Sequence, residues 1–263
     1  MADWQVGCFS RPWSQWGFDE ALDGMKAAGF RQIGLLGGHK GEPFLSPKAT
    51  PDYLDQLKQR IAARGLEATF GRLPTRHNIP LQDAIASARQ HIDQARRLGL
   101  TYLITFASDK PEEYEHYYRL MTEAAAYAAP HGIQILFKPH GGCSAAAEEM
   151  LECIRQVNHP NFHLWYDAGN IIHYTGKDPV EDVERVARYV TGFCAKDCAT
   201  KGGDVMIQFG DGKVDFAGVF RKLQAAGFNG PVMIECCAGQ TFEEVNAKAR
   251  ENRLFLERLF ASL

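Results

Sequence analysis

The sequence predicts an α/β fold, a single (β/α)8 barrel that uses all 263 residues. Apolar runs of strand length alternate with amphipathic stretches of helix length from one end of the chain to the other. Strict alternation of this kind is typical of a parallel sheet covered by helices. Eight such units fill the chain without a linker, and about 250 residues is the usual size of an eight-unit barrel. We therefore predict one domain, residues 1–263, in which the sheet closes on itself.

The predicted strands are short apolar runs, as expected for strands that are buried on both faces of a parallel sheet. They cover residues 4–9, 31–38, 66–71, 101–106, 132–137, 161–167, 190–197 and 230–235.

Each predicted strand is followed by a stretch with helical periodicity. In the first of these, Ala21, Leu22, Met25 and Ala28 fall at the spacing of one helix face. Gly99 gives the third helix a clear end, because glycine adopts the backbone conformation that terminates helices. The predicted helices cover residues 18–30, 51–65, 81–99, 111–132, 146–157, 178–190, 215–227 and 241–260.

Composition narrows the range of functions. A hydrophobic content of 45% and a charged content of 23% are ordinary for globular proteins, and the net charge of −3 gives no reason to expect a nucleic acid as partner. No apolar run approaches the roughly 18 residues that a membrane span requires, and the first residues lack the pattern of a signal peptide. We expect a cytoplasmic protein whose seven cysteines are reduced thiols.

Chemically active residues follow the last four predicted strands. Lys138 comes directly after the fifth strand, Asp167 ends the sixth, Lys196 lies within the seventh, and Glu235 ends the eighth. The carboxyl ends of the strands are where a (β/α)8 barrel keeps its active site. The sequence therefore predicts an enzyme that acts on a small sugar or polyol.

Four segments also carry a family resemblance: FGDGKVDFAGVFRKLQAAGFNGPVMIE at residues 209–235, WYDAGN at 165–170, CAKD at 194–197 and GIQILFKPH at 132–140. Together they resemble the xylose-isomerase-like sugar phosphate isomerase/epimerase superfamily of TIM barrels. The resemblance covers essentially the whole chain, and the terminal segment is its most specific part.

The resemblance implies a divalent metal held by Glu, Asp, His and Glu from strands five to eight. Asp167 and Glu235 match two of these positions. Lys138 stands where the first glutamate is expected, and Cys194 stands where the histidine is expected.

Two interpretations of the site follow. In one, Asp167, Glu235, His140 and Cys194 bind a divalent metal (Zn, Mn or Mg), and the mixed sulfur, nitrogen and oxygen donors favour a zinc-like ion. In the other, the ammonium of Lys138 lies between Asp167 and Glu235 in place of the metal and polarises the substrate, or desolvation lowers its pKa and makes it a Schiff-base nucleophile. Lys138 is alternatively only an ionic bridge. His140 is a candidate general acid or base.

Candidate substrate-binding residues lie on the loops after the strands. Trp13 and Trp16 are expected to form an apolar wall against a sugar face, and His173 is a loop candidate. Lys196 is a further substrate-binding candidate, and Lys196 and Asp197 could also pair with each other in a supporting role. Other polar residues on these loops are candidates for binding an acidic group: His39, Lys40, Arg72 and His77.

The leading hypothesis is a sugar isomerase or epimerase that removes a proton next to the carbonyl of a keto sugar or polyol. A lyase acting on a 3-keto sugar, glycoside or inosose begins with the same step, so the sequence leaves both open. A barrel that binds sugar without turnover is the third hypothesis. A DNA-repair endonuclease of the same architecture is disfavoured, because it would need more histidine ligands and a basic groove. A homo-oligomer is compatible with the sequence.

Overall fold

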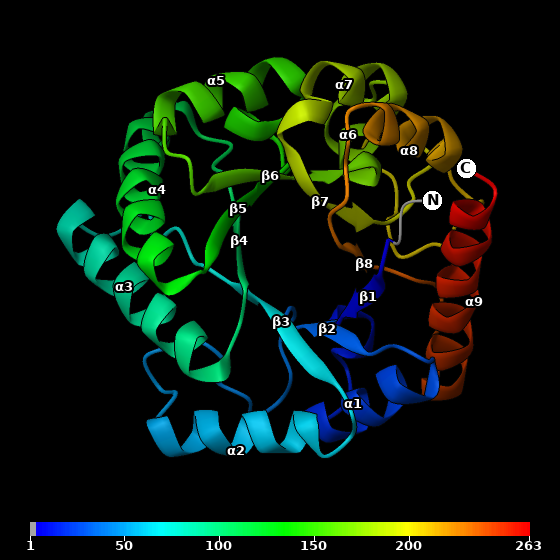
Figure 1. Cartoon of the computed structure of the whole chain (residues 1–263), viewed down its shortest axis with the longest axis horizontal. Helices are drawn as coiled ribbons and strands as arrows, with labels where there is room; N and C mark the ends of the chain where they lie inside the picture. The colour runs from blue at the N-terminus through cyan, green and yellow to red at the C-terminus, as the bar shows by residue number, and fades with distance from the viewer. Residues whose placement is uncertain (1–3) are drawn as a thin grey trace.

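A computed structural model describes residues 4–263 and confirms a closed barrel of eight parallel strands, a (β/α)8 TIM barrel (Figure 1). The strands pair in chain order, and β8 closes the barrel by pairing with β1, where Val6 lies opposite Val232. The strands are β1 (Val6–Phe9), β2 (Gln32–Gly34), β3 (Glu67–Arg72), β4 (Tyr102–Phe106), β5 (Gln134–Lys138), β6 (Phe162–Asp167), β7 (Val190–Ala195) and β8 (Val232–Ile234). Residues 1–3 of the predicted domain lie outside the described residues.

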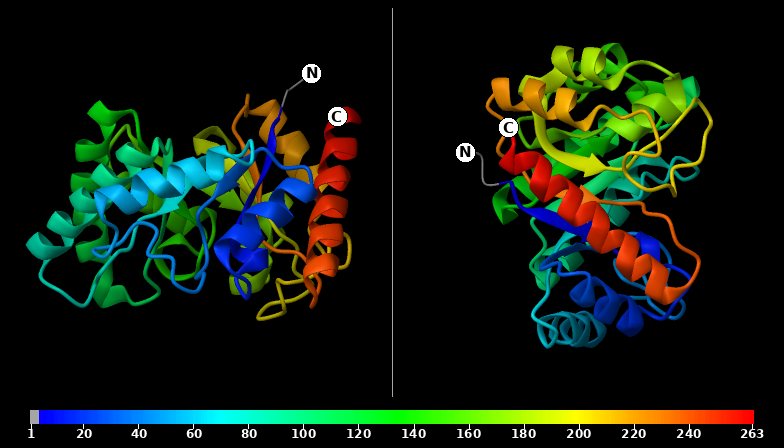
Figure 2. Two further views of the ribbon diagram at one scale, coloured as in Figure 1. Left: turned by 90° about the horizontal axis from the view of Figure 1, so that it is seen from below. Right: turned by 90° about the vertical axis from the view of Figure 1, so that its right-hand side faces the viewer.

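Helices surround the barrel as an outer ring, and the start of β1 and the end of α9 lie at the same end of the molecule (Figures 1 and 2). The α-helices are α1 (Phe18–Ala27), α2 (Pro51–Ala62), α3 (Leu81–Leu98), α4 (Tyr114–Ala128), α5 (Ala147–Val157), α6 (Ala168–Thr175), α7 (Pro179–Val186), α8 (Phe216–Ala225) and α9 (Phe242–Ala261). Short 3-10 helices cover Arg11–Trp13, Pro111–Glu113, Ala129–His131, Gly142–Ser144 and Ala187–Tyr189. Within residues 4–263, none of the helices combines the length and the apolar character needed to span a lipid bilayer.

Helix α6 is an addition to the predicted pattern. The segment after the sixth strand reads as a loop in sequence, but it forms a helix that begins immediately at the end of β6. Asp167 caps this helix, because its side chain accepts a hydrogen bond from the backbone N–H of Asn170 at 2.9 Å. Asp167 is thus both the last residue of β6 and the N-cap of α6.

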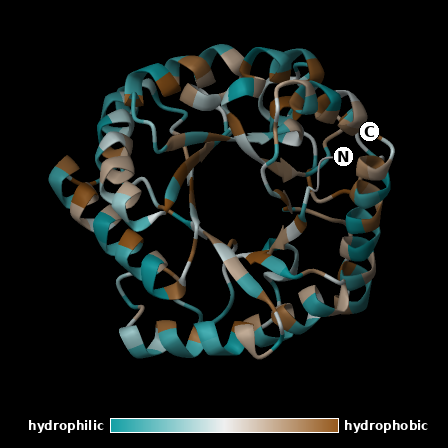
Figure 3. Cartoon of the chain, viewed as in Figure 1, coloured by the Kyte–Doolittle hydropathy of each residue, from teal (hydrophilic) through white to brown (hydrophobic). Residues whose placement is uncertain are grey.

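Two apolar layers hold the barrel together. The outer one lies between the strands and the inward faces of the helices, whose apolar residues turn toward the barrel (Figure 3). The inner layer fills the barrel itself, as in other eight-stranded barrels. It consists of Phe9, Leu36, Phe70, Ile104, Leu136, Trp165, Cys194 and Met233.

The inner layer has room for the Trp165 ring because the neighbouring residue on β7 is a glycine. Gly192 on β7 lies opposite Trp165 on β6, and a Cβ atom on Gly192 would fall 1.8 Å from the Trp165 ring. Replacing Gly192 by alanine should therefore lower the free energy of unfolding by at least about 1–3 kcal/mol, since overpacking forces the core to rearrange. Urea titration would measure this, with Gly38→Ala as the control because nothing described lies within 4 Å of a Cβ there. If the two variants were equally stable, the close packing of Gly192 against the Trp165 ring would be contradicted.

Candidate active site at the carboxyl ends of the strands

Strand alternation explains why four charged residues meet. Side chains two positions apart on a strand point to the same face. Lys138 lies two residues after Leu136 of the inner layer; Asp167, Lys196 and Glu235 follow Trp165, Cys194 and Met233 in the same way. The four charged side chains therefore form the next layer of the barrel interior, directly above the apolar one.

The four residues form a buried ion cluster. The ammonium Nζ of Lys138 lies 2.9 Å from Oδ2 of Asp167 and contacts Oε2 of Glu235. The Nζ of Lys196 lies 3.3 Å from the same Asp167 oxygen and 2.9 Å from the same Glu235 oxygen. All four side chains are at most 4% exposed. Two carboxylates and two ammoniums thus balance one another in a site from which water is largely excluded.

Glu235 has two further partners. Arg11, on the 3-10 helix after β1, places Nη1 2.8 Å from Oε1 of Glu235, and its side chain is 36% exposed. The thiol of Cys194 lies 2.8 Å from Oε2 of Glu235. Arg11 is therefore a partly exposed cation that contacts the buried cluster.

Helix α6 fixes one side of the cluster. The amide of Asn170 accepts from Nζ of Lys196 at 3.1 Å and donates to the carbonyl of Pro139 at 2.6 Å. Asp167 uses Oδ1 for the helix cap, and among the described residues no well-aimed hydrogen bond reaches its Oδ2. The charge of that oxygen is balanced instead by the two ammoniums at ion-pair distance. These contacts hold Asp167 and Lys196 in fixed positions.

The cluster keeps Lys138, Lys196 and Glu235 charged. Burial lowers the pKa of Lys138, but the Asp167 and Glu235 carboxylates outweigh burial and leave the pKa raised, and Lys196 behaves in the same way. Burial raises the pKa of Glu235, yet Lys138, Lys196 and Arg11 hold it well below its usual value. The prediction that desolvation makes Lys138 a Schiff-base nucleophile is therefore corrected, because an ion-paired ammonium has no free electron pair.

His140 lies beside the cluster, in a half-buried position. Its ring packs against Phe106 and Tyr174, and Nε2 lies 2.9 Å from the Tyr174 hydroxyl. Burial, assisted by the positive charges of Lys138 and Lys196, lowers the pKa of His140 to about 4. The imidazole is therefore neutral at physiological pH and shares a hydrogen bond with the Tyr174 hydroxyl.

The residues present do not fit a divalent metal. One group of potential ligands lies close together in the described chain, the side chains of Asp167, Cys194 and Glu235. Burial, followed by the nearby Asp167 and Glu235 charges, raises the pKa of the Cys194 thiol well above its usual value, so the thiol is protonated in the metal-free cluster. His140 lies outside this group. A dication would also have to displace two ammoniums from the same carboxylates, which Coulomb repulsion opposes.

Lys196 and Asp197 do not pair with each other. Lys196 points into the ion cluster, whereas Asp197 accepts hydrogen bonds from four backbone N–H groups of the segment that follows β7. The donors are those of Cys198, Gly210, Gly212 and Val214, at 2.8–3.1 Å. The two neighbours point in opposite directions because side chains alternate at a strand end, so Lys196 belongs to the cluster and Asp197 organises the adjoining loop.

The other predicted substrate-binding residues make their described contacts outside the ion cluster. Trp13 lies on the 3-10 helix after β1 and is fully buried, with its Nε1 donating to Asn246 of α9 at 2.7 Å. Trp16 is half-buried and packs edge-on against Phe242. His173 lies on helix α6 rather than on a loop, with Nδ1 2.8 Å from the carbonyl of Gly203.

Sequence reasoning did not identify several contacts of the site: Arg11, Phe106, Asn170 and Tyr174. Arg11 and Glu235 lie 224 residues apart and meet only because the barrel closes between β8 and β1. Phe106 ends β4 opposite Lys138 in the sheet, and the Lys138 ammonium lies 5.4 Å from its ring centroid. The position of Phe106 at a strand end was the one available signal.

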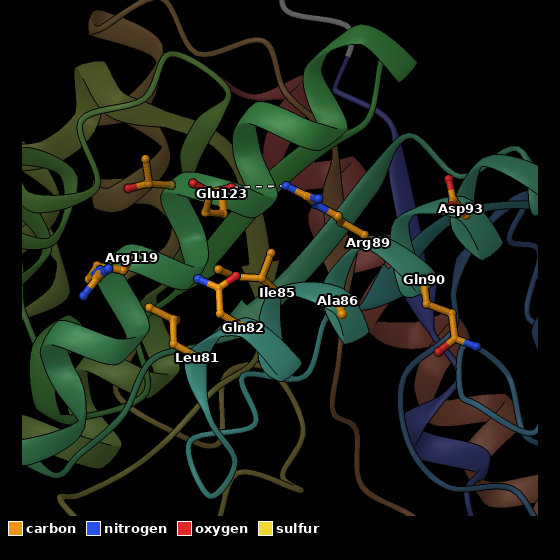
Figure 4. Close-up of a pocket in the computed structure, with 10 residues that line it drawn as sticks. Leu81, Gln82, Ile85, Ala86, Arg89, Gln90, Asp93, Arg119 and Glu123 are labelled. Carbon is orange, nitrogen blue, oxygen red and sulfur yellow. Dashed lines mark hydrogen bonds and ion pairs between the residues drawn. The ribbon is translucent and has the colours of Figure 1, made fainter.

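A separate groove lies on the outer surface between α3 and α4 (Figure 4). Its volume is about 740 Å³, and Arg89 and Glu123 face each other across it at 3.3 Å. None of the candidate catalytic residues lines it. The chemistry of the chain is therefore concentrated inside the barrel.

Comparisons with known proteins agree with the fold. Residues 22–259 match the family described as xylose isomerase-like TIM barrel. An inosose dehydratase from Lacticaseibacillus casei is 21% identical over 253 residues, 83% of this chain and 81% of the relative. The rhizopine catabolism protein MocC from Rhizobium meliloti is 27% identical over 140 residues, which is 47% of this chain but only 43% of that protein's length.

Solved structures show the same architecture. A xylose isomerase-like TIM-barrel protein from Mycobacterium smegmatis, crystallised in complex with magnesium, superposes with a TM-score of 0.80 at 18% identity and covers 99% of this chain and 97% of its own. An L-ribulose 3-epimerase superposes with a TM-score of 0.76 at 17% identity, covering 98% and 95%. At such identities the similarity establishes the fold, and the family match over most of the sequence establishes the relationship: this chain belongs to the xylose isomerase-like TIM-barrel family.

Proposed function

We propose that the chain is a sugar isomerase or epimerase that removes a proton next to the carbonyl of a keto sugar or polyol. In this proposal the Lys138 ammonium stabilises the negative oxygen that forms, and the Glu235 carboxylate takes the proton. The family match and the epimerase among the structural neighbours support the reaction class. The geometry of the ion cluster supports the roles of the two residues.

One observation carries the proposal: among the described residues, three oxygens surround the ammonium of Lys196, whereas two surround the ammonium of Lys138. An ammonium has three N–H donors. Lys196 has oxygens of Asp167, Glu235 and Asn170 within 3.3 Å. Lys138 contacts the same two carboxylates, and its third donor faces only the weak sulfur acceptor of Cys194 at 3.8 Å. A substrate oxygen is a better acceptor and would take that donor.

The proposed steps balance in atoms and electrons. Glu235 accepts the proton from the carbon beside the carbonyl, the C–H electrons form a carbon–carbon double bond, and the carbonyl oxygen becomes an anion hydrogen-bonded to Lys138. Protonation of the opposite face of the same carbon by a second acid, with Glu235 releasing its proton to solvent, gives an epimer. Return of the proton to the neighbouring carbon, with a hydroxyl proton moving between the two oxygens, gives an isomer.

A carboxylate of lowered pKa is a weak base, but the same cations act on the substrate. Lys138 stabilises the developing oxygen anion in a site with little water, where such an interaction is stronger than in solution. The acidity of the substrate C–H therefore rises together with that of Glu235. The neutral His140, beside the Tyr174 hydroxyl, is suited to move the second proton between the substrate oxygens.

A lyase reaction is the second candidate, and the inosose dehydratase relative favours it. It begins with the same proton removal, after which a hydroxide on the next carbon leaves, takes a proton and departs as water. The Glu235 carboxyl group, protonated in the first step, supplies that proton and returns to its ionised form. The first chemical step is common to both candidates, so an assay of that step tests both.

Exchange of substrate hydrogen with solvent measures this first step. We expect the purified protein in D2O to introduce deuterium beside the carbonyl of a keto sugar or inosose, as followed by NMR. Because ammoniums occupy both carboxylates, exchange should persist after treatment with EDTA, and added Mg²⁺, Mn²⁺ or Zn²⁺ should not increase it. Exchange that requires one of these ions would overturn the role of Lys138. Binding of the sugars without any exchange would favour the non-catalytic barrel.

A further inference from the structure

The ion cluster together with Arg11 carries one more positive than negative charge, although the whole chain is slightly acidic at −3. The buried cluster of Lys138, Lys196, Asp167 and Glu235 is balanced, and Arg11 adds one positive charge on its exposed side. A rim of one sign around a desolvated site raises the local concentration of ligands of the opposite sign. The surroundings of Lys138 therefore favour a negatively charged ligand.

Arg72 adds a second cation to this rim. It ends β3 at the same end of the barrel as the cluster, and its guanidinium lies 5.3 Å from the centroid of the Phe106 ring. The Lys138 ammonium lies 5.4 Å from the same ring. Among residues 4–263, Arg72 has no ion pair or side-chain hydrogen bond. Stacking on an aromatic ring holds the planar group in place and leaves its donors available for a carboxylate.

A cavity of about 320 Å³ adjoins Arg72 at the loops after β2 and β3. Leu36, which also belongs to the inner layer of the barrel, forms part of its wall. The other charged lining residue, Glu42, is already occupied by Arg60 at 2.7 Å and by the Tyr53 hydroxyl at 2.6 Å. Arg72 is therefore the one lining charge left without a partner, and the volume is at the lower end of that of small-molecule sites.

We infer that the substrate is a keto sugar acid, with its carbonyl at Lys138 and its carboxylate at Arg72, assisted by the exposed side of Arg11. A carboxylate matches the bidentate donor geometry of a guanidinium, which a sugar hydroxyl does not. This inference rests on the proposed function for the position of the carbonyl, and it adds the chemical class of the substrate.

Binding measurements with matched pairs of compounds test the class independently of turnover. D-fructuronate differs from D-fructose, and D-tagaturonate from D-tagatose, by a carboxylate in place of a terminal hydroxymethyl group. By isothermal titration calorimetry, each acid should bind about tenfold or more tightly than its neutral partner, the ratio expected for hydrogen bonds to a charged group. Equal affinity, preference for the neutral sugars, or no binding of either acid would overturn the inference.

A pair of arginine variants locates the effect. Arg72→Gln should reduce the preference for each acid over its neutral partner by about tenfold. Arg31→Gln removes the same charge just before β2, at the opposite end of the barrel, and should leave the preference unchanged. An unchanged preference in Arg72→Gln would overturn the assignment. Deuterium exchange with the same compounds reports separately on the proposed reaction: tight binding of an acid without exchange would support the ligand class and contradict the reaction.

Discussion

Replacing Lys138 by methionine should lower kcat for proton exchange by about 10²–10³-fold, the usual effect of removing one donor to a developing oxyanion. Methionine has a similar length and no charge, so it removes the ammonium while filling most of its space. The loss should appear in kcat more than in KM, because the spare donor is used most strongly when the oxygen becomes negative. Steady-state kinetics of deuterium exchange would measure it.

Lys196→Met is the matched control for this variant. Both lysines are buried, and both contact the same carboxylate oxygens of Asp167 and Glu235. Removing either should reduce the free energy of unfolding by about 3–5 kcal/mol, since a buried charge loses its partner. Lys138 has fewer oxygen neighbours than Lys196 and is the one proposed to bind the substrate oxygen, so its variant should lose more activity. Equal losses of kcat would mean that Lys138 is an ionic bridge and not the electrophile.

The fold could be predicted from the sequence because each of its determinants is local. Alternating apolar runs and amphipathic stretches define eight strand–helix units, and parallel pairing in chain order follows from them. Helix α6 escaped this reasoning because it begins without any loop. Asp167 serves at once as strand end and helix cap, and no separate turn residue marks the boundary.

The site could be predicted only in part, and Lys196 illustrates the limit. Asp167 and Glu235 follow directly from strand ends, and so does Lys138. The two-residue period of a strand places Lys196, two residues after the buried Cys194, in the same layer as these three. That signal was present in the sequence. Arg11 had none, because its contact with Glu235 depends on where a short helix after β1 directs a long side chain.

The charge balance explains how the barrel can function with two altered positions. In the resembled pattern a glutamate stands at the position of Lys138, and exchanging a carboxylate for an ammonium raises the local charge by two. This is the charge of a divalent ion. The negative charges of Asp167 and Glu235 are therefore balanced by Lys138 and Lys196. In the resembled pattern a divalent metal supplies the same change in charge.

Glu235→Gln should produce the second large effect, a loss of about 10²–10⁴-fold in kcat, as expected when a general base is removed. Contrary to the simplest expectation for a catalytic carboxylate, the fold should also weaken. Glutamine leaves Lys138 and Lys196 with Asp167 as their one carboxylate partner in the cluster, and it removes the carboxylate that pairs with Arg11. We expect the free energy of unfolding at neutral pH to fall by about 3–5 kcal/mol, as measured by urea titration.

The dependence of this loss on pH identifies its cause. The surrounding cations hold the pKa of Glu235 well below the ordinary value of 4.5. A carboxylate whose pKa is lowered in the folded state stabilises the fold fully above its unfolded pKa, and the stabilisation disappears as pH falls toward the folded pKa. The difference in unfolding free energy between the native protein and Glu235→Gln should therefore be greatest at neutral pH and should narrow below about pH 4, where unfolded carboxylates become protonated. Glu67→Gln, at an exposed position on β3, should change stability by less than about 0.5 kcal/mol throughout. A difference for Glu235→Gln that stays constant from pH 7 to pH 3 would mean that shape, and not the charge of this carboxylate, holds the cluster together.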